Sequence, residues 1–257
     1  MNAPLLQLDQ ATMQFGGLKC VCDLSFIVTA GGLVGLIGPN GAGKTTVFNL
    51  ITGVYRPTAG NITFAGKSVV GHRPYRITSR GIARTFQNIR LFGSLTVFDN
   101  VRTACNMHLR HGISHALMRG PKFAAENRTT ENFVEELLQI FGLTAARDEP
   151  CRSLSYGGQR RLEIVRALAT RPKLLLLDEP AAGMNPTEKI ELMKLIRFTQ
   201  EKFGLAVLLV EHDMKVVMGI CERIIVLDYG RKIAEGTPAE IRTDPKVIAA
   251  YLGKEAA

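Results

Sequence analysis

The chain has 257 residues, of which 46% are hydrophobic and 21% charged, a composition that favours a folded globular core over disorder. Its formal net charge of +9 would suit an anionic partner, but the lysines and arginines are dispersed, so charge alone is a weak indication. The longest apolar runs have the length of strands and not of membrane spans, and the five cysteines are too scattered for a zinc cluster, so we expect reduced thiols.

The first part of the chain predicts a hairpin followed by a buried strand. Apolar residues alternate over 6–15, the pattern breaks at Gly16-Gly17, and it resumes over 21–28, which is typical of an antiparallel pair. The run LVGLIG at 33–38 is typical of a fully buried strand, and it leads through a glycine loop into a helical pattern at 47–51. A strand, a glycine loop and a helix therefore follow one another directly.

The later part of the chain alternates strands with helices, and the middle is helical. Residues 89–165 show no buried strand and several helical patterns, such as 131–141, so we expect a helical subdomain inserted into one α/β core of residues 1–88 and 166–257. A helix is expected at 187–203, and EGTPAEIRTDP near the end predicts a turn and a short helix. Further short strands are predicted at 61–65, 174–177, 205–210 and 223–228. The expected fold is α/β with a parallel sheet and an antiparallel amino-terminal portion.

The glycine loop carries a phosphate-binding pattern. GPNGAGKTT at 38–46 satisfies G-x-x-x-x-G-K-[ST], and it lies between a buried strand and a helix, as the motif requires. The glycines let successive backbone N–H groups converge on phosphate oxygens, Lys44 neutralises charge on the β and γ phosphates, and Thr45 can hold Mg²⁺. An ordinary glycine turn is the alternative, and the strand-loop-helix context weighs against it.

Two carboxylates end the apolar strand of KLLLLDEP. In a P-loop protein Asp178 at this place completes the Mg²⁺ site, and Glu179 can polarise an attacking water molecule. Acidic residues are common at strand ends, but a tandem pair downstream of a phosphate loop favours the functional interpretation.

Two more polar residues are expected at the same edge of the sheet. His212 follows the strand in LLVEHD and could hold the water or Glu179, although a lone histidine is often structural. Gln87, in ARTFQNIRLF, could sense Mg²⁺ and water while its loop touches another protein; its spacing alone indicates this weakly.

A second helix start of the phosphate-binding kind lies more than a hundred residues after the first. In LSYGGQRRLEIVRALA, Ser155, Gly157 and Gly158 precede an amphipathic helix. One small chain would not need two such sites for a single phosphate group.

The ordered set GPNGAGKTT, Gln87, LSYGGQ, LLLLDEP and His212 resembles the nucleotide-binding subunits of ATP-binding cassette (ABC) transporters over nearly the whole chain. In that family two subunits, identical or related, pack head to tail, and the LSYGGQ signature of one closes over the ATP held by the other. The resemblance implies an ATPase with ATP and Mg²⁺ as cofactors, separate integral membrane permease subunits as partners, and a periplasmic binding protein acting indirectly. It implies a peripheral location on the cytoplasmic face of the membrane and no nucleic acid.

The resemblance also assigns residues. Phe15 matches the aromatic residue that stacks on adenine, although it could simply belong to a strand core. Catalytic roles fall on Lys44, Gln87, Glu179 and His212, and metal contacts on Thr45, Gln87 and Asp178. The remaining nucleotide contacts fall on Asn40, Gly41, Gly43, Thr46, Ser155, Gly157, Gly158 and Gln159.

Two departures and several shared stretches point to a subgroup. Tyr156 replaces the usual glycine of the signature, and Met184-Asn185 stands where Leu-Asp is usual; Asn185 before Pro186 also predicts a helix N-cap. FGGLK, ARTFQNIRLF, DEPAAGMNP, VEHDMKVVMGIC and the closing AAYLG are similar to the ATP-binding subunits of branched-chain or hydrophobic amino-acid importers. The expected role is to power that import, by association only.

Other readings of the chain remain open. The ATPases of lipopolysaccharide export and of urea or amide import share the motif style. Soluble ABC ATPases that act on nucleic acid typically carry a long coiled coil, zinc cysteines or two cassettes, which are not seen in this sequence. A small-molecule P-loop kinase would leave LSYGGQ without a role.

Overall fold

The computed structural model describes residues 4–108 and 121–252 and groups the chain into two compact units. The core unit comprises Met1–Gln87 and Lys173–Ala257, and the helical unit comprises Asn88–Pro172. Within the described ranges, no helix is long and apolar enough to cross a membrane.

The core unit is built on a six-stranded sheet of order β10-β9-β3-β8-β7-β6. Neighbouring strands run parallel except at one edge, where β10 pairs antiparallel with β9. β3, β7 and β8 are buried along their whole length, because helices and a second sheet cover both faces of a parallel sheet. The strands are β3 (Leu33–Ile37), β6 (Ile82–Arg84), β7 (Leu174–Asp178), β8 (Ala206–Val210), β9 (Arg223–Asp228) and β10 (Arg231–Gly236).

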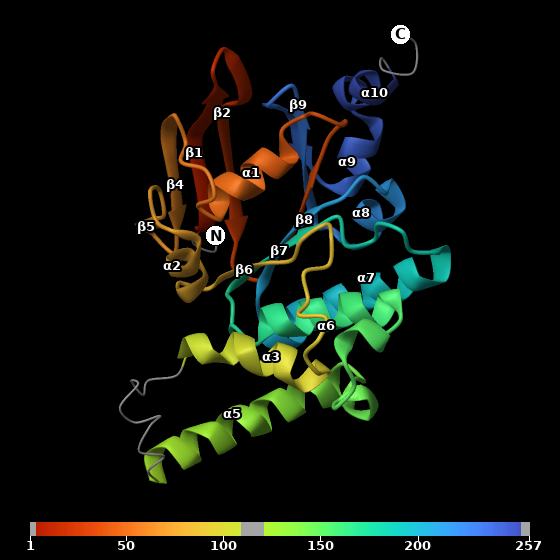
Figure 1. Cartoon of the computed structure of the whole chain (residues 1–257). Coiled ribbons are helices and arrows are strands. Elements are labelled where there is room, and N and C mark those ends of the chain that lie inside the picture. Colours follow the sequence, from red (N-terminus) through yellow and green to blue (C-terminus); the bar gives the residue numbers. More distant parts are fainter. Residues whose placement is uncertain (1–3, 109–120, 253–257) are drawn as a thin grey trace. The chain divides into compact units, whose positions relative to one another are not determined.

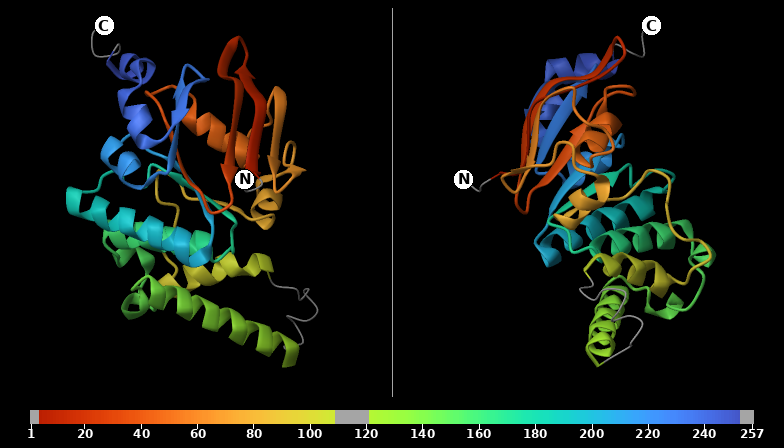
Figure 2. Two further views of the ribbon diagram at one scale, coloured as in Figure 1. Left: turned by 180° about the vertical axis from the view of Figure 1, so that it is seen from behind. Right: turned by 60° about the vertical axis from the view of Figure 1, so that its left-hand side comes forward.

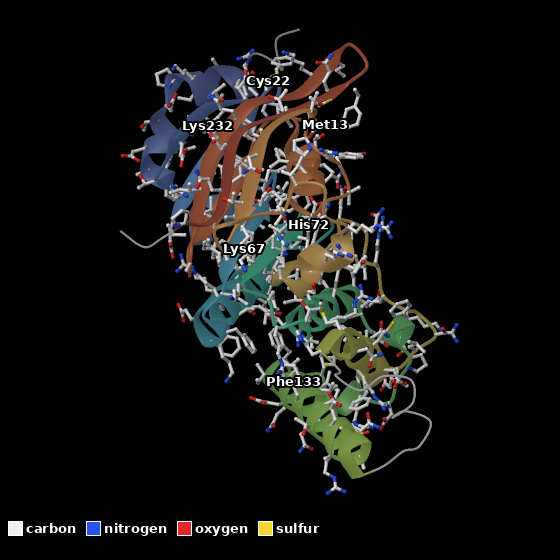
Figure 3. All side chains as sticks on the ribbon, turned by 90° about the vertical axis from the view of Figure 1, so that its left-hand side faces the viewer. Met13, Cys22, Lys67, His72, Phe133 and Lys232 are labelled. Atoms are coloured by element: carbon white, nitrogen blue, oxygen red, sulfur yellow. The ribbon has the colours of Figure 1, made fainter. Side chains whose placement is uncertain are left out.

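A four-stranded antiparallel sheet of order β2-β1-β4-β5 completes the strands of the core unit. Phe15 pairs with Leu18 across the Gly16-Gly17 turn, which confirms the predicted hairpin. Met13 and Cys22 lie on its paired strands (Figure 3), and both are largely buried. The strands are β1 (Pro4–Phe15), β2 (Leu18–Thr29), β4 (Ala59–Phe64) and β5 (Lys67–Ser68).

Helix α1 (Lys44–Ile51) lies between the two sheets (Figure 1). Its Val47 and Phe48 are fully buried in one apolar cluster with Leu8 of β1 and Leu36 of β3, so the helix that follows the glycine loop is anchored on both sides. Helices α9 and α10 lie on the other side of β9 from α1 (Figure 2). The other helices of the core unit are α2 (Pro74–Ser79), α7 (Pro186–Phe203), α8 (Met214–Ile220), α9 (Pro238–Thr243) and α10 (Pro245–Leu252).

Helix α7 begins where the sequence predicts. The Asn185 side chain accepts from the Glu188 N–H at 3.0 Å, and the Glu188 carboxylate accepts from the Asn185 N–H at 2.8 Å. This reciprocal capping box, followed by Pro186, satisfies N–H groups at the helix start. Asn185 therefore has the structural role that the sequence predicts for it.

The described part of the helical unit contains three longer helices, α3 (Val97–Cys105), α5 (Pro121–Ile140) and α6 (Tyr156–Leu168). α3 packs against α5 and α6, and each of the three contributes buried apolar residues. Phe133 lies on α5 (Figure 3), and the Arg171 guanidinium lies 4.6 Å from the centre of its ring. Short 3₁₀ turns lie at Asn106–His108, Thr144–Ala146 and Cys151–Ser153.

Candidate functional site

The glycine loop at 38–43 joins the end of β3 to the start of α1, and its backbone requires glycine at two positions. At Gly38 a Cβ atom would lie 2.1 Å from the Leu227 carbonyl oxygen. At Gly43, where φ is +99°, it would lie 2.5 Å from the Cys20 carbonyl oxygen. The loop therefore packs tightly against β9 and β2, which fixes the direction of its amides.

Lys44 turns its ammonium group back toward this loop. The Nζ atom donates to the Gly38 carbonyl at 2.6 Å and to the Pro39 carbonyl at 3.0 Å, and the residue is only 7% exposed. Asn40, Gly41 and Thr45 are exposed around it. The loop thus presents a buried cation beneath an open surface.

The start of α1 also fits an anion. Its first turn carries no acidic residue, and no described side chain caps its N-terminus at Gly43. The amide N–H groups of a first turn and the positive end of the helix dipole attract phosphate. The loop, Lys44 and α1 are therefore suited to a phosphate chain, as the motif predicts.

The predicted acidic pair lies at the carboxyl end of β7. Asp178 is 5% exposed and forms an ion pair with Arg84 at the end of β6, with 2.7 Å between Oδ2 and Nη2. Glu179 follows in the left-handed region, with φ at +45°, and its N–H donates to the Val210 carbonyl of β8 at 2.8 Å. This backbone turn gives the two neighbouring carboxylates different surroundings.

Glu179 is the centre of a three-residue cluster within the core unit. Gln87 Nε2 donates to Glu179 Oε2 at 2.8 Å, and His212 Nδ1 lies 3.6 Å from the same oxygen. The three residues follow the carboxyl ends of β6, β7 and β8, which are neighbours in the sheet. The structure therefore brings together the three residues that the sequence predicts for polarising and holding a water molecule.

Glu211, to which no sequence motif assigns a role, supports this cluster. The residue is fully buried; Oε1 accepts from the Ala181 N–H at 2.7 Å, and Oε2 accepts from the His212 N–H at 3.1 Å. Burial raises the pKa of Glu211, while its backbone hydrogen bonds and nearby His212 lower it. Through these hydrogen bonds, Glu211 links the segment that follows Glu179 to the segment that contains His212.

The oxygen donors present fit magnesium. The Thr45 hydroxyl, the Gln87 amide and the Asp178 carboxylate are hard oxygen ligands of the kind that Mg²⁺ takes. The described residues hold no group of three or more His, Cys, Asp and Glu side chains that could bind a metal by themselves. Together with phosphate oxygens, the Thr45, Gln87 and Asp178 oxygens could hold a magnesium ion.

Phe15 lies at the end of β1, where the hairpin turns. Phe15 is 42% exposed, and its ring packs edge to face against Tyr55, with 5.1 Å between the ring centres. Cys20 on the paired strand approaches Gly43 of the glycine loop. An exposed ring in the same hairpin that contacts this loop fits a stacking role.

The LSYGGQ segment forms the start of α6 in the helical unit. Ser155 is the N-cap, and its Oγ accepts from the Gly158 N–H at 3.2 Å; Gln159 Nε2 donates to the Leu154 carbonyl at 2.9 Å. A Cβ atom at Gly157 would meet nothing within 4 Å. The segment and the glycine loop belong to different units, and the structure describes them as two separate groups.

Tyr156, the departure from the usual signature, is accounted for within α6. It is 43% exposed, and its hydroxyl accepts from Arg160 Nη2 at 3.2 Å. Arg160 is itself buried and pairs with Glu163 at 2.7 Å. The tyrosine thus stabilises the first turns of this helix.

These features define an ATPase of the P-loop class with the ABC arrangement of motifs. The family model described as "ABC transporter" matches residues 21–182, and that described as "Branched-chain amino acid ATP-binding cassette transporter" matches residues 231–257.

Similar proteins agree with that class. The chain is 43% identical to the high-affinity branched-chain amino acid transport ATP-binding protein BraF of Pseudomonas aeruginosa, over 99% of this chain and 100% of that protein. It is 37% identical to the lipopolysaccharide export system ATP-binding protein LptB of Escherichia coli K12, over 94% of each chain. The crystal structure of the ADP conformation of MJ1267, an ATP-binding cassette of an ABC transporter, superposes with a TM-score of 0.84 at 28% identity, covering 98% of this chain and 100% of that one. The chain belongs to the ABC transporter family of ATP-binding proteins.

Proposed function

We propose that this chain binds Mg·ATP and hydrolyses it to power the import of branched-chain or other hydrophobic amino acids through separate membrane permease subunits. The observation that carries the ATPase proposal is the cluster of Gln87, Glu179 and His212 at the sheet edge that also carries the phosphate loop. The import proposal is supported by the similarity to BraF and by the match of residues 231–257.

The binding roles follow from the geometry of the core unit. The amides of residues 40–46, with Lys44 and the start of α1, would hold the phosphates, and Phe15 would stack on the base. Thr45, Gln87 and Asp178 would hold the magnesium ion. When bound, Mg·ATP supplies the phosphoanhydride bond that is broken and the cation that screens its charge.

The chain's own residues prepare the attacking water. Glu179 would act as the general base; the hydrogen bond of its Oε2 with the Gln87 amide at 2.8 Å and the nearby His212 support this role. The backbone N–H of His212 donates to the Glu211 carboxylate, and the His212 side chain would hold the water or Glu179 in place. Lys44 and the α1 amides would stabilise the charge that develops on the phosphate.

The LSYGGQ segment would serve the nucleotide of a second ATP-binding subunit, identical or related, packed head to tail. Ser155 and the amides of Gly157 and Gly158, at the positive end of α6, would contact its γ-phosphate, with Gln159 beside them. Binding would then close the pair and hydrolysis would open it. The chain would act at the cytoplasmic face of the membrane, and a periplasmic binding protein would act on it only through the permease.

Phosphate release by the purified chain tests the ATPase proposal, with Lys44→Ala as the inactive control, because loss of the buried cation should abolish useful nucleotide binding. Phosphate release by Lys44→Ala equal to that of the wild type would contradict it. Purification from native membranes in mild detergent, with mass spectrometry of bound proteins, tests the import proposal. Two permeases and a periplasmic protein for leucine-like ligands are expected, and lipid-export components would contradict it.

A further inference from the structure

Arg84 is a buried cation in the stretch ARTFQNIRLF, and the proposed function above gives it no role. It is the last residue of β6 and pairs with Leu176 of β7 in the sheet, and its side chain is only 9% exposed. A buried charge destabilises the fold unless it is paired and hydrogen-bonded. The partners of Arg84 therefore indicate why it is there.

Three side chains share the two terminal nitrogens of Arg84. Nη2 donates to Asp178 Oδ2 at 2.7 Å, while Nη1 donates to Asn49 Oδ1 at 2.7 Å and lies 3.4 Å from Thr52 Oγ1. Asn49 is in α1 and Thr52 is its C-cap. One guanidinium thus joins the carboxylate of the last residue of β7 to the carboxyl-terminal end of α1.

Aromatic rings restrain the same group. The guanidinium carbon lies 5.4 Å from the ring centre of Phe48, which is fully buried in α1, and 5.2 Å from that of Phe86. Both distances fall in the cation–π range. The position of Arg84 is therefore set by contacts other than the one with Asp178, so it can act as a fixed support for that carboxylate.

We propose that Arg84 is a positioning residue for magnesium: it holds the Asp178 carboxylate in place relative to α1, whose first turn carries Thr45. The inference rests on the proposed function, because it concerns the metal of that same site. The planar fork of arginine can serve Asp178 and Asn49 at once, whereas the single ammonium of lysine cannot reproduce that geometry. Arg84 also lies three residues before Gln87. Its contacts therefore fix the start of the segment from which Gln87 reaches Glu179.

The test compares Arg84→Met and Arg84→Lys with the wild type, and uses Arg223→Met as a matched control. Arg223 pairs with Glu235 at 3.0 Å toward the other edge of the same sheet, so its loss removes a similar ion pair away from the site. Binding of a fluorescent, non-hydrolysable ATP analogue is measured first in EDTA and then as Mg²⁺ is added. Thermal melting confirms that each variant is folded.

Arg84→Met should bind the analogue in EDTA as the wild type does. The Mg²⁺ concentration at which the increase in analogue binding is half-maximal should rise by about 10-fold or more. Arg84→Lys should restore part of this loss, and Arg223→Met should stay within about twofold of the wild type. A folded Arg84→Met with an unchanged Mg²⁺ requirement would overturn the inference, as would an equal loss of binding in EDTA. If Arg84→Met does not fold, an unchanged Mg²⁺ requirement in Arg84→Lys would overturn it instead. A wild type that binds no nucleotide would contradict the proposed function and not the role of Arg84.

Discussion

Replacing Glu211 with glutamine tests whether the carboxylate behind the site holds it together. Glu211 is fully buried, and its oxygens accept from the N–H groups of Ala181, His212 and Asp213 at 2.7, 3.1 and 3.3 Å. Glutamine keeps one acceptor oxygen and places an NH₂ group where the other stood, so at least one backbone N–H faces another donor. An unsatisfied buried donor costs about 1–3 kcal/mol, and we expect the free energy of unfolding to fall by about 2–3 kcal/mol.

Differential scanning calorimetry should show this loss as a melting temperature lower by roughly 4–12 °C. Glu191→Gln on the exposed face of α7 is the matched control and should change stability by less than about 0.5 kcal/mol. His212 loses its backbone support in Glu211→Gln, so phosphate release should also fall. A melting temperature equal to that of the control would refute the anchoring role of Glu211.

The pH dependence of stability gives an independent check of the same residue. Burial raises the pKa of Glu211 above its ordinary value despite three backbone hydrogen bonds. Between the ordinary and the raised pKa, the folded chain keeps a proton that the unfolded chain has released, so this group makes the free energy of unfolding fall as the pH rises. Glu211→Gln should remove that contribution. An identical slope in the wild type and the variant would contradict the raised pKa.

Two further variants separate chemistry from binding. Glu179→Gln keeps the size of the side chain but removes the base, so phosphate release should fall about 10²–10⁴-fold while ATP stays bound and light scattering detects a trapped dimer; wild-type turnover would contradict the assignment. Ser155→Ala removes the N-cap of α6, at a cost of about 1 kcal/mol, and should leave nucleotide binding nearly intact while lowering turnover. Equal losses of both, by fluorescence titration and phosphate release, would exclude a role of Ser155 on the other subunit's nucleotide.

Within the six-stranded sheet, the strands that the sequence predicts are those with an unbroken apolar run. β3, β7 and β8 are buried on both faces, so nearly every position is apolar and the pattern is plain. β6 has only three residues, and β10 is a half-exposed edge strand of sequence RKIAEG, so neither carries a pattern that differs from a loop. Both strands form because a neighbouring strand offers them hydrogen bonds. Their own residues do not reveal that neighbour, because it lies elsewhere in the chain.

The candidate site likewise contains residues that a local sequence pattern reveals and contacts that depend on distant parts of the chain. Residues that belong to a local motif, such as Lys44 and Asp178, could be assigned because the strand-loop-helix context places them at one edge of the sheet. The contact of Gln87 with Glu179 spans 92 residues, and spacing alone indicates it only weakly. The place of a residue in the fold can be predicted from its own sequence neighbours, but its contact partner cannot.

Arg84 and Glu211 show how far the sequence predicts buried charged residues and their partners. Each is a charged residue attached directly to an apolar strand, and a charge in that context must find a partner to be tolerated when buried. The sequence therefore contains a reason to single out Glu211, which follows the plain apolar run of β8, but not Arg84, because β6 is not recognisable as a strand. Asp178 lies 94 residues from Arg84, and the Ala181 amide lies 30 residues from Glu211. The second partner is a backbone group that any residue could supply. A buried charge at a strand end thus predicts that a cross-link exists between segments, while only the fold reveals that both cross-links converge on the ends of β6, β7 and β8.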